Sequence, residues 1–241
     1  VLISALFFVS CATAVPPLQP EFIQPAPVTH EQKLSWILQL EDQRLLRDPS
    51  VLDSEPPTIA PLPVADSQGA VADSTTLDVT VAPSVPRAVA DLHRLATDSS
   101  AAIRRRAVIA IGRVGLVDGV ETLVGALDDP QMEVREMAAF GLGLIGDASG
   151  VAPLVAALED MSPVVQARAA QALGRLGAVN ATGAIQAMVA RHVTEAYDVG
   201  PEDLSYPQTP RVEAFRSGLY ALASLGAYDA LAASSRVQWA T

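Results

Sequence analysis

Cysteine and aromatic side chains are scarce in this sequence of 241 residues. The one cysteine, Cys11, has no partner for a disulfide and excludes a cysteine-based metal site in the folded part of the chain. Aromatic residues make up 5% of the chain, whereas apolar residues of all kinds make up 50% and include many alanines, which suits closely packed helices. Positive charge is also short, since the net charge is −11, and we therefore expect no nucleic-acid partner.

The sequence also lacks the motifs of common catalytic and cofactor sites. It contains no Gly-x-Ser-x-Gly, and His30, His93 and His192 lie far apart, without a neighbouring ligand at helical metal spacing. Residues 141–146 match the letters of the dinucleotide fingerprint, but that motif must join a strand to the beginning of a helix, and here it closes a helix. We predict no catalytic residue, no metal and no cofactor.

What the sequence does contain is a repeat. Residues 134–146 return as residues 165–177, at a shift of 31, and the same shift backwards finds residues 103–115. A fixed period of this length is typical of stacked-repeat proteins. Each unit is predicted to form two short helices, such as residues 119–127 and then residues 134–144, because apolar residues recur there at helical spacing.

Two smaller sets of residues repeat at the same period. Glycines fall where a helix is expected to end in a left-handed cap, at Gly115, Gly146 and Gly177. Aspartates fall before the second helix of each unit, at Asp98, Asp129 and Asp160. We predict that these aspartates cap the second helices and pair with Arg104 or Arg135, a structural role that requires no catalysis.

The repeated motif is apolar-Arg-x-x-Ala-Ala-x-Ala-Leu-Gly-x-Ile/Leu-Gly, nearly complete at residues 134–146 and 165–177. It resembles the HEAT-like repeats, in the short form first described in phycobilin lyases. The resemblance implies an all-α fold, an α-solenoid, and says little about function. The repeat spacing predicts about four to five helical hairpins in it, and composition predicts a disordered N-terminal linker before it. Bilin attachment follows only from the naming history of the repeat, and a chain that we expect to be exported and that has no lyase motif argues against it.

The beginning of the chain predicts export. The chain does not begin with Met, and residues 1–14 read as the remnant of a signal peptide: an apolar run at residues 1–9, too short to span a bilayer, precedes Ser10 and Cys11. Two processing routes remain open, ordinary cleavage after residues 12–14 and lipidation of Cys11, which would anchor the chain to a membrane. We expect the protein to be periplasmic, or lipid-anchored at the cell envelope.

Residues 15–28 form a Pro-rich segment, and residues 29–48 are predicted to form an amphipathic helix capped by Thr29 and Gln32. Residues 49–85 carry Pro, Ala, Ser, Thr and Asp without a sustained period, which predicts a disordered linker. Residues 31–44 also resemble the leader region of exported bacterial HEAT-repeat proteins that continue into a cyclophilin-type peptidyl-prolyl isomerase domain.

The solenoid is predicted to span residues 86–241. In its fourth unit, residues 181–193 read as the first helix and residues 212–225 as the second, closing at Gly226. Gly226 lies 49 residues after Gly177, which predicts an insertion of 18 residues at 194–211, either a projection from the binding face or an inert loop. A fifth unit begins at Ala227, and because the end shows no polar cap, we expect further chain to follow.

One stripe on the second helices is predicted to bind a partner. Core positions at 103, 107, 110, 111 and 114 leave positions 106, 109 and 113 on an adjoining face. Across three units this face reads Arg106, Ile109 and Arg113, then Met137, Phe140 and Leu144, then Arg168, Gln171 and Arg175. By resemblance to HEAT-like proteins the face is concave, which predicts a groove with an apolar floor and a basic border. The alternative is that the apolar triplet packs on a neighbouring helix or on residues 29–48.

Two functions remain open from the sequence. The first is an exported, non-catalytic scaffold, expected to be a monomer, that binds a protein or peptide on the concave side of the solenoid. The second is the client-binding portion of a peptidyl-prolyl isomerase whose catalytic domain lies beyond residue 241. We favour the first, because no catalytic residue is present within this chain.

Overall fold

The structure of this chain is a computed structural model that describes residues 27–49, 89–197, 208–230 and 232. All of the named helices belong to one compact unit, made of Val28–Asp73 and Ala88–Thr241. Within the described residues there are helices and an isolated β-bridge, but no β-strand. This confirms the predicted all-α class. The predictions for residues 1–14, including Cys11, for most of the Pro-rich segment and for nearly all of the 49–85 linker lie outside the described residues.

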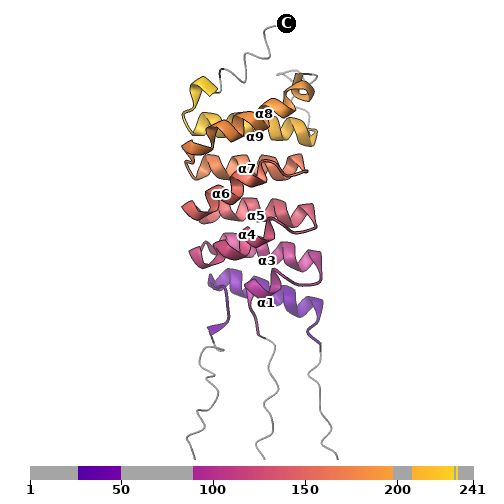
Figure 1. Cartoon of the computed structure of the whole chain (residues 1–241). Helices are drawn as coiled ribbons and strands as arrows, with labels where there is room; N and C mark the ends of the chain where they lie inside the picture. The colour runs from indigo at the N-terminus through magenta and orange to yellow at the C-terminus, as the bar shows by residue number, and fades with distance from the viewer. Residues whose placement is uncertain (1–26, 50–88, 198–207, 231, 233–241) are drawn as a thin grey trace, which may run out of the picture. The chain divides into compact units, whose positions relative to one another are not determined.

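Four helical hairpins follow one another along the described part of the chain (Figure 1). Their first helices are α2 (Leu92–Leu95), α4 (Val120–Ala126), α6 (Val151–Ala157) and α8 (Thr182–Tyr197). Their second helices are α3 (Ala101–Val114), α5 (Met132–Ile145), α7 (Pro163–Arg175) and α9 (Pro210–Ser224). Short 3₁₀ turns lead into α4, α6 and α8: η2 (Val117–Gly119), η3 (Ala148–Gly150) and η4 (Val179–Ala181). The predicted α-solenoid is confirmed.

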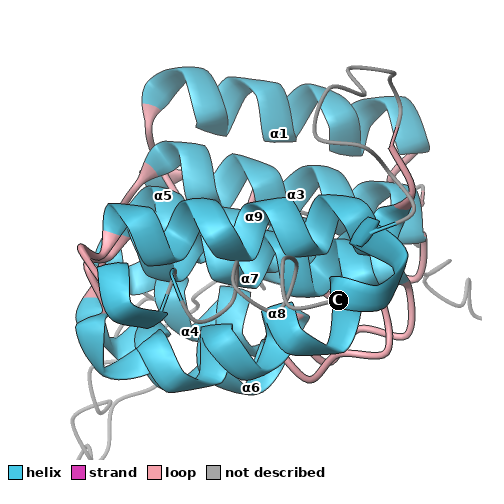
Figure 2. Cartoon of the chain, turned by 90° about the horizontal axis from the view of Figure 1, so that it is seen from above, coloured by secondary structure: helices cyan, strands magenta, loops and turns pink. Residues whose placement is uncertain are grey.

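The helices form two layers (Figure 2). The second helices stack on one another in chain order, with α3 on α5, α5 on α7 and α7 on α9, while the first helices pack against them from one side. The preceding helix, α1 (His30–Gln43), packs mainly on α3 and so lies at the end of the second-helix layer. It therefore covers the apolar surface that the first repeat would otherwise expose.

The core consists of the positions that the repeat predicted. Ile103, Ala107, Ala110 and Ile111 are fully buried in α3, and most of their equivalents at a shift of 31 are buried too. Small residues bring the helices close together, since a Cβ placed on Gly112 would lie only 2.5 Å from the Cα of Gly141 in α5. Burial of aliphatic side chains at this density is what holds neighbouring repeats together.

The helix ends also follow the repeat. Gly115 and Gly146 have φ values of 76° and 77° and end α3 and α5 in left-handed caps. Gly177 and Gly226, with φ values of 65° and 66°, each follow the C-cap residue of a second helix, Leu176 of α7 and Leu225 of α9. The left-handed conformation predicted for these glycines is therefore present, and a residue with a Cβ would be strained there.

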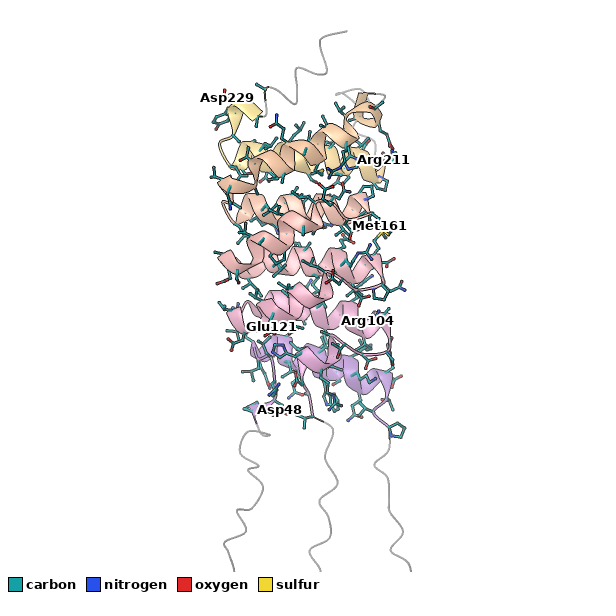
Figure 3. All side chains as sticks on the ribbon, in the orientation of Figure 1. Asp48, Arg104, Glu121, Met161, Arg211 and Asp229 are labelled. Carbon is teal, nitrogen blue, oxygen red and sulfur yellow. The ribbon has the colours of Figure 1, made fainter. Side chains whose placement is uncertain are left out.

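Two of the three aspartates that precede the second helices, Asp129 and Asp160, join one repeat to the next, whereas Asp98 pairs with Lys33 of α1. Asp129 accepts a hydrogen bond from the backbone N–H of Gln131, the N-cap of α5, and both its oxygens accept from Arg104, at 2.6 and 2.9 Å. Asp160 is held in the same way by Arg135, at 2.7 and 3.0 Å. Each arginine thus reaches the aspartate of the following unit. Figure 3 places Arg104 on the edge of the stack where the second helices begin.

Two predicted boundaries need correction. Helix α1 ends at Gln43, because Arg44 takes the left-handed conformation (φ 56°), so the predicted helix over residues 29–48 is five residues too long. Leu46 is buried nevertheless, since its segment runs beside the beginning of the first repeat: the N–H of Leu92 donates to the Leu46 carbonyl at 2.9 Å. An ion pair between Arg47 and Asp91 fixes this crossing.

The predicted insertion at residues 194–211 is also too wide. Helix α8 continues to Tyr197 and α9 begins at Pro210, so both ends of that stretch belong to helices. Pro210 fits the first turn of α9, because the backbone N–H that proline lacks would make no hydrogen bond within the helix there. Residues 198–207 and most of the predicted fifth unit lie outside the described part of the chain.

Candidate partner-binding face of the second helices

The nine residues predicted to bind a partner lie on three adjacent helices. Five of them are half-buried: Ile109, Met137, Phe140, Arg168 and Gln171. The other four are exposed: Arg106, Arg113, Leu144 and Arg175. We call the surface of α3, α5 and α7 that carries these positions, together with its continuation on α9, the second-helix face. Because the core positions lie on the other side of the same helices, this face is in contact with solvent.

Phe140 on α5 is the centre of the strongest cluster on this face. The guanidinium carbon of Arg175 lies 5.3 Å from the centroid of its ring, and that of Arg168 lies 5.9 Å from it. Both distances are within the range of a cation–π interaction. The structure therefore brings Phe140 of the predicted apolar triplet together with the predicted arginines Arg168 and Arg175 on α7.

A chain of hydrogen bonds crosses the same face. Arg168 donates from Nε to a carboxylate oxygen of Glu136 at 3.0 Å and from Nη1 to Oε1 of Gln171 at 3.1 Å. Gln171 in turn donates from Nε2 to the hydroxyl oxygen of Ser217 at 2.8 Å. These bonds link α5, α7 and α9, and they hold the side chains of Arg168 and Gln171 in fixed orientations.

The basic border of the face is partly neutralised. Arg113 donates to Glu41 on α1 at 2.9 Å, and Arg168 pairs with Glu136 on α5. Within the described residues, Arg106 and Arg175 have no carboxylate partner. These two arginines therefore keep their charge available for a ligand.

The three apolar residues of α5 do not all follow one of the two alternatives, a partner-binding groove or packing on a neighbouring helix. Met137 packs against the hydrophobic core, as the packing alternative predicts. Phe140 is half-buried beneath the two guanidinium groups, and Leu144 is 40% exposed. Phe140 and Leu144 thus remain within reach of a partner, whereas Met137 mainly supports the fold.

The fourth repeat adds residues that the sequence analysis did not name. Ser217 and Tyr220 of α9 occupy the positions equivalent to Arg168 and Gln171, at the shift of 49 that relates Gly177 to Gly226. They line a hollow of about 410 Å³ together with Gln171, Arg175 and Arg216. The signal for them was present, since applying that shift to the stripe would have extended it onto α9.

Arg106 lies at a different hollow, of about 490 Å³, near the beginnings of the stacked helices. Its lining includes His30 and Leu34 of α1, Arg105 of α3 and Glu133 of α5. The nine predicted residues therefore do not converge on one pocket. They extend along a face, with a hollow beside Arg106 and another beside Arg175.

Two of the three histidines, His93 and His192, are at least half-buried and hydrogen-bonded, whereas His30 is exposed. His93 is half-buried, and its Nδ1 lies 2.5 Å from the hydroxyl oxygen of Thr122. His192 is buried, and its Nε2 lies 2.6 Å from Oε1 of Gln166. Among the residues that the structure describes, no three metal-ligating side chains form a group that could hold a metal ion. None of the described helices is long and apolar enough to cross a membrane.

The glycines of the apparent dinucleotide fingerprint have packing roles. Gly141 faces Gly112 of the preceding repeat, and a Cβ on Gly143 would lie 2.8 Å from the Cβ of Ala172 in the following one. Gly146 forms the left-handed cap of α5. The motif therefore lies at the end of a helix that is enclosed by its neighbours, where no dinucleotide phosphate has a helix N-terminus to bind.

Solved structures with similar folds include a chain from the complex of CpcE and CpcF of the phycocyanin lyase of Nostoc sp. PCC7120. The two chains are 24% identical, with a TM-score of 0.49 over 68% of this chain and 60% of that chain. An engineered protein is also 24% identical, with a TM-score of 0.35 over 60% of this chain and 70% of the other. This chain thus spans less than two thirds of the lyase chain. No curated protein matches it.

The resemblance of residues 31–44 to isomerase leaders has no match of its own here and stays a prediction. The repeat itself has a match among protein families. Residues 120–199 match the family described as HEAT repeats, which covers the second and third hairpins and the first helix of the fourth. The resemblance inferred from the 31-residue motif is therefore confirmed over residues 120–199.

Proposed function

We propose that this protein is a non-catalytic scaffold that binds a protein or peptide on the second-helix face. The charge of the second helices carries this proposal. Together α3, α5, α7 and α9 contain nine arginines and three glutamates, in a chain whose net charge is −11. Arg104 and Arg135 are largely buried in ion pairs, whereas the second-helix face carries four of the others: Arg106, Arg113, Arg168 and Arg175. An arginine-rich surface with half-buried apolar side chains on an otherwise acidic protein is suited to a specific partner.

The chemistry of the face supports binding of an extended segment. Arg106 and Arg175, without carboxylate partners in the described structure, can donate paired hydrogen bonds to carboxylates or backbone carbonyls. Phe140 and Leu144 supply apolar contact area between them. A segment that follows the stack would meet arginine, then apolar side chains, then arginine again, and would be recognised by this order.

Selection of peptides on the whole chain tests the proposal. A displayed library of random twelve-residue peptides is selected on the immobilised protein, and the affinity of synthetic copies is measured by fluorescence anisotropy. We expect Phe140→Ala and Arg106→Glu each to weaken binding by roughly tenfold or more, as losses at binding hot spots do. Arg94→Glu is the matched control, because Arg94 is an exposed arginine on α2, in the other layer.

Thermal unfolding of the same variants separates binding from stability. The proposal predicts unfolding midpoints close to that of the wild type for Arg106→Glu and Arg94→Glu, since both side chains are exposed. Lowered stability of Phe140→Ala without altered affinity, together with unchanged affinity of Arg106→Glu, would show that the stripe only packs.

We further propose that the protein is exported. The support is the apolar run of residues 1–9 followed by Ser10, Cys11 and small residues. Mass spectrometry of the protein isolated from its source tests this. A mature N-terminus after Ala14 indicates ordinary cleavage, and a lipid-modified Cys11 indicates membrane anchoring. An uncleaved protein that retains residues 1–9 would contradict export.

A further inference from the structure

The hollow between α7 and α9 has the properties of a small binding site. Its five lining residues are Gln171 and Arg175 from α7 and Arg216, Ser217 and Tyr220 from α9. Its volume of about 410 Å³ falls in the range of ligand pockets, roughly 300–1,000 Å³. Both walls come from helices, so the positions of these side chains are set by the stacking of the third repeat on the fourth.

The lining of this hollow consists of hydrogen-bond donors and positive charge. Its lining residues carry two guanidinium groups, two hydroxyls and one amide, and none of these residues is acidic. The carboxamide of Gln171 uses Nε2 to donate to the oxygen of Ser217, which leaves the hydroxyl proton of Ser217 outside that bond. Such a lining favours an anion and disfavours a cation.

Arg175, an exposed donor of this hollow, is held in place by contacts with neighbouring side chains. Arg175 lies over the Phe140 ring at 5.3 Å, and Phe140 is also covered by Arg168 at 5.9 Å. Arg168 is in turn fixed by Glu136 and Gln171. Because these contacts orient the wall before any ligand arrives, less side-chain entropy is lost on binding.

From this geometry we infer that the hollow binds a carboxylate of the partner. The inference rests on the proposed function, since it names the chemistry of one contact on the second-helix face. A carboxylate is planar and accepts two parallel hydrogen bonds from one guanidinium, which matches Arg175, an exposed lining residue of the hollow. The carboxylate comes either from an acidic side chain of the partner or from its C-terminus.

Three synthetic peptides of eight residues, each with one central phenylalanine, distinguish these sources. The first has four glutamates and blocked ends, the second has glutamines in their place and blocked ends, and the third is the glutamine peptide with a free C-terminal carboxylate. Binding to the full ¹⁵N-labelled chain is followed by shifts of the Gln171 side-chain amide and the Tyr220 backbone amide.

We expect the blocked glutamate peptide, the free-ended glutamine peptide, or both to bind about tenfold more tightly than the blocked glutamine peptide. The blocked glutamine peptide has no carboxylate, so it leaves the guanidinium of Arg175 without a charged partner. Arg175→Lys should weaken that binding about fivefold or more, because lysine keeps the charge and loses the fork. Arg94→Lys on α2 is the matched control and should change nothing.

Equal affinity of all three peptides would overturn the inference, and so would equal effects of Arg175→Lys and Arg94→Lys. The outcome is separable from that of the proposed function. If library-selected peptides depend on Phe140 and Arg106 but need no carboxylate, the scaffold stands and the carboxylate site fails. If they ignore Phe140 and Arg106, the scaffold itself fails.

Discussion

Arg104 of the first repeat donates two hydrogen bonds to Asp129 of the second, at 2.6 and 2.9 Å, with both side chains largely buried. Its Nη1 also donates to the backbone carbonyl of Asp98, at 3.0 Å. One arginine thus ties the loop of its own repeat to the loop of the next. Arg135 repeats this arrangement with Asp160 and the Asp129 carbonyl. The solenoid is therefore joined by polar contacts along one edge as well as by its apolar core.

Arg104→Ala is expected to lower the free energy of unfolding by about 1.5–3 kcal/mol, because it leaves a largely buried carboxylate without its charged donor. Arg105→Ala is the matched control. Arg105, the residue after Arg104, is exposed and has no ion pair in the described structure, so its loss should change the free energy of unfolding by no more than about 0.5 kcal/mol. Urea unfolding followed by circular dichroism measures both. Equal losses in the two variants would contradict the role of the Arg104–Asp129 pair.

The Arg104–Asp129 pair also predicts that the stability of the fold falls at acidic pH. The hydrogen bond from Arg104 lowers the pKa of Asp129, against the opposing effect of burial. A carboxyl with a lowered pKa stabilises the fold fully above its unfolded value, about 3.9, and this contribution is lost as the pH falls through the folded pKa below it. Asp129→Asn should therefore be less stable than the wild type at about pH 7, with a difference that narrows at about pH 2.5. A difference that is constant over this range would argue against the assignment.

His192 predicts a second pH range in which the stability of the fold changes. Its Nδ1 is buried without a hydrogen-bond partner, and burial, aided by Arg191 and Arg211 and opposed by Glu195, lowers its pKa. Below the ordinary value of about 6.5 the unfolded chain takes up a proton first, so stability falls with the pH from there. His192→Leu should lose less stability than the wild type between about pH 7.5 and pH 5. His30→Gln, at an exposed site, should behave as the wild type does.

The close approach of α3 and α5 can be tested with alanine. Gly112→Ala would place a Cβ 2.5 Å from a backbone atom of Gly141, which requires the repeats to move apart and should cost about 1–3 kcal/mol. Gly125→Ala is the control, because nothing lies within 4 Å of a Cβ there, and it should stabilise the protein by about 0.4–1 kcal/mol. Thermal unfolding compares the two. A neutral Gly112→Ala would show that the repeats have room to relax.

The repeat explains how much of this structure could be predicted. A period of 31 residues fixes which positions of α3 are buried, and the same positions recur in α5 and α7. The end of α1 follows no repeat, and it is set by the pairing of residues 46–48 with residues 90–92, which are distant in sequence. The bounds of α8 and α9 were missed for a related reason, since the fourth unit departs from the period.

For the binding face, the sequence indicated which side chains share a stripe but not what else reaches it. Glu41 meets Arg113 from a helix 72 residues earlier, and Gln171 meets Ser217 from 46 residues away. These contacts depend on how α1 and α9 stack on the regular repeats. They neutralise Arg113 and create the hollow beside Arg175, two properties that no local pattern shows.

Mapping of a bound peptide by photo-crosslinking tests the central claim most directly. A library-selected peptide is irradiated with variants of the full chain that carry benzoylphenylalanine at Ile109, Leu144 or Tyr220 on the second-helix face, or at Glu121 or Ala156 on the first helices. We predict crosslinks from the first three positions and none from the last two. Crosslinks confined to the first helices would contradict the claim that this solenoid binds its partner on the second-helix face.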